Sequence, residues 1–256
     1  MRKHFSPSWF IDYKSCPKAF YYKHIAGIKL PERKIHLIFG EAFHSSAEIL
    51  LSREWEKENP VEIAQLEFER KFNPETIALE EREDYERLFP IGLAMIEKFN
   101  TEIPLLDLKY SILKGKSEEW IEAILQDPFS KELLPLNTKG KIDRLTDDEN
   151  IIELKTSSGK WDERETKFKW QTQFYGWMFY QNKGRHSKKI VYVIVTKQKN
   201  PQIQILEVNY ILEDYSKLFQ DCKNIINKIE LGIFERPEDW HPNYCDCFKY
   251  EEALNS

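Results

Sequence analysis

The chain has 256 residues, 41% of them hydrophobic and 32% charged, a composition typical of a globular protein with one sizeable core. No window approaches the roughly 18 uninterrupted apolar residues of a membrane-spanning helix, and the opening residues lack the apolar stretch of a secretory signal. Four cysteines are too few for a disulfide-stapled scaffold of this length. We therefore expect a cytoplasmic protein with no membrane partner.

The net charge of −5 hides a strong segregation of charge along the chain. Residues 1–36 carry eight basic and two acidic side chains, and residues 155–199 carry eleven and three, whereas the segments 37–154 and 200–256 are acidic. The two basic blocks could converge into a groove for a phosphate backbone. Ordinary surface variation would give the same counts, so charge alone leaves both interpretations open.

The N-terminal region reads as helical. Residues 8–22 have apolar side chains at roughly helical spacing, and Pro17 interrupts them, which predicts two short helical turns. A further helix opens at Phe39-Gly40-Glu41-Ala42-Phe43-His44, and His44 lies at the margin of its apolar face. A lone histidine in such a place is more often structural than a ligand.

The next segment is helical and strongly acidic over residues 61–99, and residues 120–125 continue the helical character. This pattern predicts a solvated helical insert or lid at about residues 57–130. No composition shift or repeat divides the chain, so we expect one domain over residues 1–256.

A sheet is predicted from about residue 137. Residues 139–145 and 151–156 are short runs separated by a turn-rich interval, which predicts adjacent antiparallel strands. The rest of the chain predicts an aromatic and basic helix, two further strands and a closing amphipathic helix, at residues 161–180, 189–196, 202–208 and 210–233. The order indicates an α/β fold with a mixed sheet, its core at about 137–210 and a closing helix and tail at 210–256.

The chemistry-bearing residues lie on the predicted hairpin. Glu153 and Lys155 share one side of their strand, Leu154 points into the core, and Asp143 on the partner strand can lie opposite them. Two carboxylates brought together repel unless a cation lies between them, and a hard divalent ion suits such a pair. The lysine can hold an attacking water and neutralise charge at phosphorus. An exposed salt-bridged hairpin would contain the same residue types, so spacing alone leaves that alternative open.

The stretch GKIDR followed by IIELKT resembles the signature of the PD-(D/E)XK nuclease superfamily in its RecB-like form, with Asp143, Glu153 and Lys155 in the motif positions. Residues 5–28 resemble the helical opening of RecB-like and AddB-like nuclease domains, the type also found in CRISPR-associated exonucleases. FGEAFHSSAEIL is similar to their G-x-x-x-H helix, and Gln171 with Tyr175 fits their Q-x-x-x-Y motif.

This resemblance implies a restriction-endonuclease-like fold, in which a mixed central sheet is flanked by helices. It implies a divalent metal site, for Mg²⁺ or Mn²⁺, with four ligands: His44, Asp143, Glu153 and the backbone carbonyl of Leu154. It also implies that Gln171 and Tyr175, which share one helical face, orient the lysine or contact the phosphate.

The activity that the resemblance implies is a metal-dependent deoxyribonuclease, foremost an exonuclease in recombination, repair, phage DNA metabolism or CRISPR adaptation. The alternative is a non-catalytic DNA-binding or scaffold subunit that keeps the nuclease fold. Because the sequence contains no G-x-x-x-x-G-K-[ST] loop, any unwinding would need a helicase or recombination partner.

Basic and aromatic residues after the hairpin predict a place for DNA: Lys160, Trp161, Arg164, Lys167 and Lys169. This mixture suits backbone contact and base stacking, and hence single-stranded or frayed DNA. A solvated helix with aromatic core contacts would explain any one of these residues equally well.

Some RecB-like nucleases hold a four-iron cluster with one N-terminal and three C-terminal cysteines. The candidates in this chain are Cys16, Cys222, Cys245 and Cys247. Cys245-Asp246-Cys247 is C-x-C where the family has C-x-x-C, and no cysteine follows it. We therefore expect a relative without the cluster.

Overall fold

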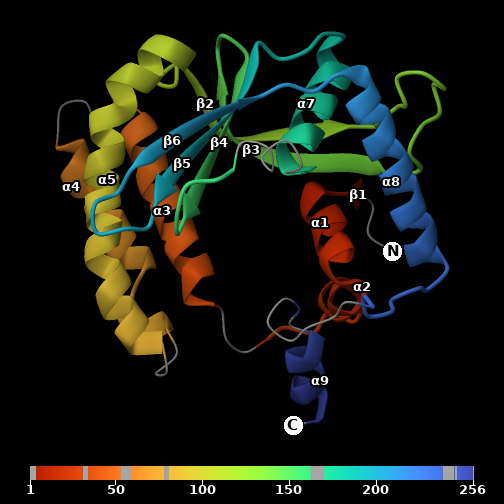
Figure 1. The fold of residues 1–256 in the computed structure, drawn as a ribbon, viewed down its shortest axis with the longest axis horizontal. Helices are drawn as coiled ribbons and strands as arrows, with labels where there is room; N and C mark the ends of the chain where they lie inside the picture. The colour runs from red at the N-terminus through yellow and green to blue at the C-terminus, as the bar shows by residue number, and fades with distance from the viewer. Residues whose placement is uncertain are drawn as a thin grey trace.

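A computed structural model describes residues 4–30, 34–52, 59–77, 81–162, 170–238, 245 and 247–255. Its centre is a six-stranded mixed sheet (Figure 1). The strands are β1 (His4–Phe5), β2 (Gly115–Ala123), β3 (Asn137–Thr146), β4 (Asn150–Ser157), β5 (Lys189–Thr196) and β6 (Ile203–Val208). Their order is β1-β3-β4-β5-β6, with β2 paired to β3; β1 runs parallel to β3 and β4 parallel to β5, and the other pairs are antiparallel.

Two groups of helices cover the sheet. Figure 1 shows α3 (Ile35–Leu51), α4 (Pro60–Lys71) and α5 (Arg82–Tyr110) on one side, and α1 (Pro7–Ser15), α7 (Trp170–Lys183) and α8 (Leu212–Glu230) on the other. Strand β5 is apolar or aromatic from Ile190 to Val195 because each of its faces meets a different group of helices. Its even-numbered residues pack with α7 and α8, and its odd-numbered ones pack with α3 and α5: Ile190, Tyr192 and Ile194, then Val191, Val193 and Val195.

A segment after α1 and a segment near the C-terminus pack together outside the two main hydrophobic cores. The helix α2 (Pro17–Phe20) and the π-helical turn Tyr21–Ile25 follow α1, and α9 (Cys247–Asn255) ends the described chain. A small third cluster joins the two ends: Cys16, Tyr22, Cys245, Cys247 and Tyr250. A 3-10 turn, Pro74–Thr76, lies between α4 and α5.

Most predicted elements are confirmed. The buried strand has the bounds expected of it, the hairpin is formed by β3 and β4, and the closing helix is α8. The acidic insert contains two helices, α4 and α5. The predicted helix at residues 161–180 begins at Trp170, and residues 163–169 lie outside the described residues. No helix among the described ranges is both long and apolar enough to cross a bilayer.

One part of the insert was predicted wrongly. Residues 120–125 were expected to be helical, but Gly115–Ala123 forms strand β2, which pairs with β3 along its whole length. The local pattern has a period of two, since Trp120 and Glu122 are exposed while Ile121 and Ala123 are buried. The helix α9 was not predicted.

Candidate active site

The two carboxylates of the motif meet where β3 and β4 separate. Backbone pairing of these strands ends at Leu145–Ile151 and Arg144–Ile152, and Asp143 and Glu153 are the next residues on their strands. At Leu154, the backbone N–H donates to Asp143 Oδ2 over 2.8 Å. The Asp143 side chain therefore takes the place of a strand carbonyl and is held at a defined position.

Glu153 is completely buried beside this carboxylate. Its Oε1 accepts a hydrogen bond from Lys155 Nζ at 2.5 Å, while Oε2 has no hydrogen-bond partner within the described part of the chain. Burial, together with the nearby charge of Asp143, raises the pKa of Glu153 well above its usual range. A buried carboxylate oxygen without a donor is costly, and a bound cation would remove that cost.

His44 reaches the same point from α3. Its Nδ1 lies 3.7 Å from Asp143 Oδ2, and the ring forms a hydrogen bond with the Leu154 backbone. Burial lowers the pKa of His44, and the Asp143 carboxylate opposes this only in part. The imidazole is therefore neutral near pH 7, which is the form that binds metals.

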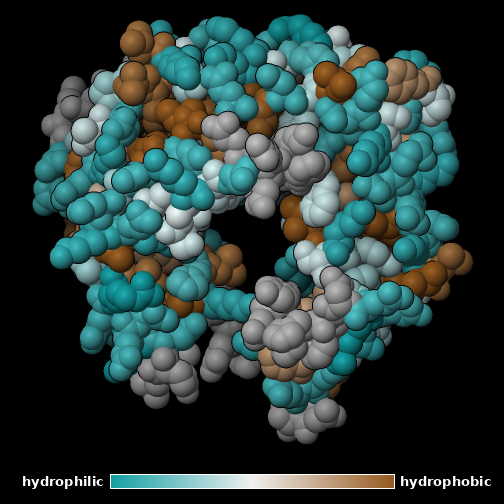
Figure 2. Space-filling model, viewed as in Figure 1, coloured by the Kyte–Doolittle hydropathy of each residue, from teal (hydrophilic) through white to brown (hydrophobic). Residues whose placement is uncertain are grey.

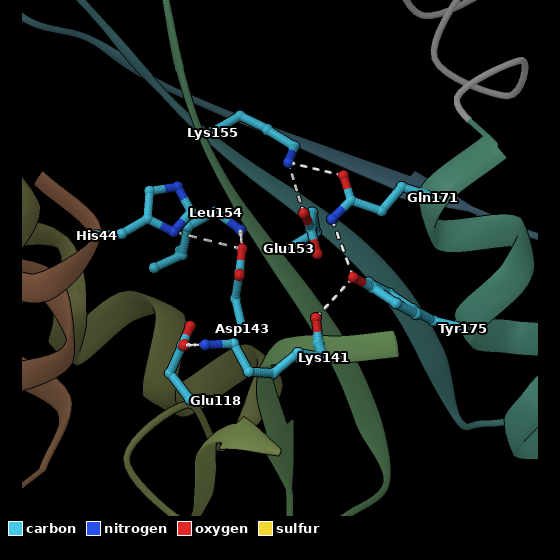
Figure 3. A network of polar contacts seen from close by, with 9 residues as sticks. All are labelled: His44, Glu118, Lys141, Asp143, Glu153, Leu154, Lys155, Gln171 and Tyr175. Carbon is cyan, nitrogen blue, oxygen red and sulfur yellow. Dashed lines mark hydrogen bonds and ion pairs between the residues drawn. The ribbon is translucent and has the colours of Figure 1, made fainter. Parts of the chain in front are cut away.

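Lys155 is held by a chain of hydrogen bonds that ends on β3 (Figure 3). Its Nζ donates to Gln171 Oε1 at 3.0 Å, Gln171 Nε2 donates to the Tyr175 hydroxyl at 3.0 Å, and that hydroxyl donates to the Lys141 carbonyl at 2.6 Å. Gly140 makes room for the tyrosine, because a Cβ at this position would lie 2.7 Å from Tyr175 Cε1.

The ionisation of Lys155 follows from its neighbours. Burial alone would lower the pKa of Lys155, but the Glu153 and Asp143 carboxylates outweigh it and raise that pKa. The amine therefore stays protonated and acts as a hydrogen-bond donor rather than as a base.

The donor set fits a hard divalent ion. Two carboxylates, a neutral imidazole and the adjoining Leu154 peptide form a mixed oxygen and nitrogen environment that suits Mg²⁺ or Mn²⁺. Figure 3 shows His44, Asp143, Glu153 and Lys155 directed toward one another from α3, β3 and β4. The structure thus brings together every residue expected at the metal and catalytic positions.

A cavity of about 620 Å³ opens beside these residues. Its lining includes three residues that sequence reasoning missed, Glu41, Glu118 and Lys141. Glu118 has a left-handed backbone (φ 54°), lies opposite Asp143 in the strand register and forms an ion pair with Lys141. Nothing in the sequence marks Glu118, since neither its neighbours nor its spacing belongs to a motif.

The predicted DNA-contacting residues are only partly described. Lys160 is exposed, and Trp161 is half-buried, with its Nε1 donating to Ser157 Oγ at 3.1 Å. Its ring centroid lies 5.3 Å from that of Tyr192. Three further members of this set, Arg164, Lys167 and Lys169, lie outside the described residues.

The four cysteines do not form one group. The Sγ atoms of Cys16, Cys245 and Cys247 lie within 4.8 Å of one another. Cys222 is fully buried on α8 in the core beside α7, away from the third cluster. The structure thus brings together three of the four candidate cysteines and places Cys222 in the core beside α7.

Comparison with solved structures bears on the fold. The structure resembles that of a candidate exonuclease from Eubacterium rectale, with 17% sequence identity, a TM-score of 0.59 and coverage of 96% of this chain and 86% of that chain. At this identity the likeness shows a common fold. The structure of SSO0001 aligns with 16% identity over 82% of this chain and 83% of that chain, with a TM-score of 0.34.

No curated protein matches the sequence. A model of the PD-(D/E)XK nuclease superfamily, however, matches residues 4–249. This range contains the hairpin, the α3 histidine and the α7 motif residues described above. The chain therefore belongs to the PD-(D/E)XK nuclease superfamily.

Proposed function

We propose that this protein is a divalent-metal-dependent deoxyribonuclease that hydrolyses phosphodiester bonds at DNA ends, as an exonuclease. The observation that carries the proposal is the buried Glu153 carboxylate, whose free Oε2 lies beside Asp143 in a site that also contains a neutral imidazole and a protonated lysine. A scaffold has no physical need for a buried carboxylate oxygen without a donor, whereas a metal ion would coordinate that oxygen.

The metal ligands in this proposal are His44, Asp143, Glu153 and the Leu154 carbonyl. When bound, Mg²⁺ or Mn²⁺ lowers the pKa of a coordinated water and stabilises charge that develops on the phosphate oxygens. The protein positions these ligands through the Leu154 N–H to Asp143 hydrogen bond and the contact of His44 with the same peptide.

Lys155 has the role of positioning the nucleophile. Its ammonium has three donors, of which one is directed to Glu153 and one to Gln171. The remaining donor can hold the attacking water or a phosphate oxygen. Gln171 and Tyr175 are positioning residues, because they fix the amine through a chain of hydrogen bonds.

The substrate is DNA, with single-stranded or frayed ends favoured, and the roles in question are recombination, repair, phage DNA metabolism or CRISPR adaptation. A helicase or recombination partner would supply any unwinding, because the sequence has no P-loop motif of its own.

The test uses purified protein with end-labelled single- and double-stranded DNA in Mn²⁺ and in EDTA. We expect a product ladder from one end in Mn²⁺, none in EDTA, and none from Asp143→Asn or Lys155→Ala variants that remain folded by circular dichroism. Full cleavage by either variant would refute the assignment. Tight DNA binding with no cleavage by the native chain in Mn²⁺ would support the scaffold alternative instead.

A further inference from the structure

One large aromatic side chain of the sheet is exposed. Trp120 lies on β2, is 61% exposed and is the direct cross-strand partner of Lys141 on β3. Lys139 Nζ lies 4.6 Å and Lys141 Nζ 5.8 Å from the indole ring centroid. An indole flanked by two ammonium groups combines a stacking surface with donors for phosphate.

Trp120 lies on the same side of the sheet as the catalytic carboxylate. Along β3, Thr138, Gly140 and Ile142 are buried, whereas the alternate residues Lys139, Lys141 and Asp143 are only partly buried. Directly paired residues project to the same side, so Trp120 shares this side with Lys141 and Asp143. Two strand residues span about 7 Å, which is the separation of Lys141 from Asp143 along β3.

A cavity beside the indole and the cavity at the site share one lining residue. A cavity of about 510 Å³ is lined by Trp120, Lys141, Gln171 and Tyr175 among others, and the site cavity is lined by Lys141 with His44 and Lys155. Lys141 belongs to both. Figure 2 shows a hollow between α3 and α1 on the face that it presents.

We propose that Trp120 is a stacking platform for an unpaired base of the DNA strand, one or two nucleotides from the phosphate at the metal site. The proposal rests on the proposed function and specifies its substrate as single-stranded DNA. A base within a duplex is already stacked on its neighbours, so its face is not free for the indole.

The charges around the indole favour stacking as the main source of affinity. Lys141 forms an ion pair with Glu118, and Lys139 Nζ lies 4.0 Å from the Glu122 carboxylate. These carboxylates offset much of the attraction that the two lysines exert on phosphate. We therefore expect Trp120 to favour unpaired over paired DNA and to add little general affinity for phosphate.

The other tryptophan proposed for stacking has less free surface. Trp161 donates through Nε1 to Ser157 and packs against Tyr192, so contacts within the fold cover part of its ring. Trp120 was missed because residues 120–125 were interpreted as part of a helix, in which its pairing with Lys141 is not visible.

The experiment compares Trp120→Ala, Trp120→Phe and a control, Phe129→Ala, which removes a ring that is 56% exposed and outside both cavities. Binding of fluorescein-labelled single-stranded and blunt duplex oligonucleotides is measured by anisotropy in EDTA. We expect Trp120→Ala to weaken single-strand binding about tenfold, Trp120→Phe to retain most of the affinity, and duplex binding to stay unchanged. The control should match the native protein on both substrates.

A 2-aminopurine scan identifies the base. Quenching by the native protein should peak at one position near the strand end and should be lost in Trp120→Ala. Three outcomes would overturn the inference. Trp120→Ala could bind single strands as tightly as the native protein does, it could lose affinity equally for single-stranded and duplex DNA, or the native protein could fail to bind single strands. These binding measurements need no cleavage, so they test the stacking proposal independently of the proposed function. Trp120-dependent binding without hydrolysis in Mn²⁺ would reject the nuclease activity and still support stacking on Trp120.

Discussion

Replacement of Glu153 by glutamine should stabilise the metal-free protein while it removes metal binding. Glutamine keeps the shape of the side chain and an acceptor for Lys155, but it carries no charge into a fully buried site. The substitution therefore separates the effect of the buried carboxylate on stability from its role in metal binding. If Glu153 were an ordinary structural partner of Lys155, the same change would only weaken the fold.

The size of the expected stability change follows from the raised pKa of Glu153. Burial, with the Asp143 charge, raises the pKa of Glu153 from 4.5 to about 8. The folded protein thus holds this proton more tightly than the unfolded chain, and the fold loses stability as pH rises from about 4.5 through 8. At pH 7 the loss is on the order of 3 kcal/mol, and near pH 5 it falls below about 1 kcal/mol. For a chain of this length, 1 kcal/mol corresponds to roughly 2–4 °C in Tm.

The assay is thermal unfolding of the native protein and of Glu153→Gln in EDTA and in Mn²⁺. In EDTA at pH 7 the variant should melt several degrees higher, and the difference should narrow toward pH 5. Mn²⁺ at a hundred times its Kd should stabilise the native protein by about 2.7 kcal/mol and the variant much less. A variant that melts lower than the native protein in EDTA at pH 7, or gains as much from Mn²⁺, would refute the reasoning.

Three further substitutions test other parts of the site and fold. Gly140→Ala places a Cβ 2.7 Å from the Tyr175 ring, so we expect kcat to fall about ten- to hundredfold while the Mn²⁺-induced Tm shift persists; loss of both would point to a general disturbance of the sheet. Arg144→Met leaves three backbone carbonyls without their donor and should lower the free energy of unfolding in urea by about 2 kcal/mol; an unchanged midpoint would contradict this. Glu207→Gln should flatten the fall of Tm at acid pH, because hydrogen bonds from Tyr110 and nearby lysines lower the pKa of Glu207 to about 2. The stability that Glu207 contributes is present above pH 4.5 and is lost as the pH falls toward 2, so parallel Tm profiles for the variant and the native protein would contradict this prediction.

The predictable parts of the fold are those with a local pattern. The run KIVYVIVT predicts a doubly buried strand because all eight side chains suit a strand with helices on both faces. The spacing of Gln171 and Tyr175 places both on one face of a helix, and they are indeed linked by a hydrogen bond. The hairpin follows from two short runs and a turn-rich interval, and it is enough to bring Asp143 and Glu153 together.

The parts that were missed depend on contacts distant in sequence. β2 is an edge strand with mixed polar and apolar residues, and only its pairing with β3 makes its period of two meaningful. Glu118 joins the site cavity because that pairing brings it opposite Asp143. Arg144 follows Asp143 in the sequence, yet it donates to the carbonyls of Leu51, Ile112 and Leu113 and joins the end of α3 to the loop before β2.

The location of the site follows from the way β4 changes partners. Along its full length β4 pairs with β5, but its recorded pairing with β3 ends at Arg144–Ile152. Beyond that point one edge of β4 is left without a neighbouring strand, and the Asp143 carboxylate accepts the Leu154 N–H that the ladder no longer uses. His44 reaches Asp143 from one helical layer, and Gln171 reaches the Lys155 amine from the other, so both layers meet at this end of β4. A mutation that extended the β3–β4 ladder past Arg144 would therefore close the site even if every motif residue were kept.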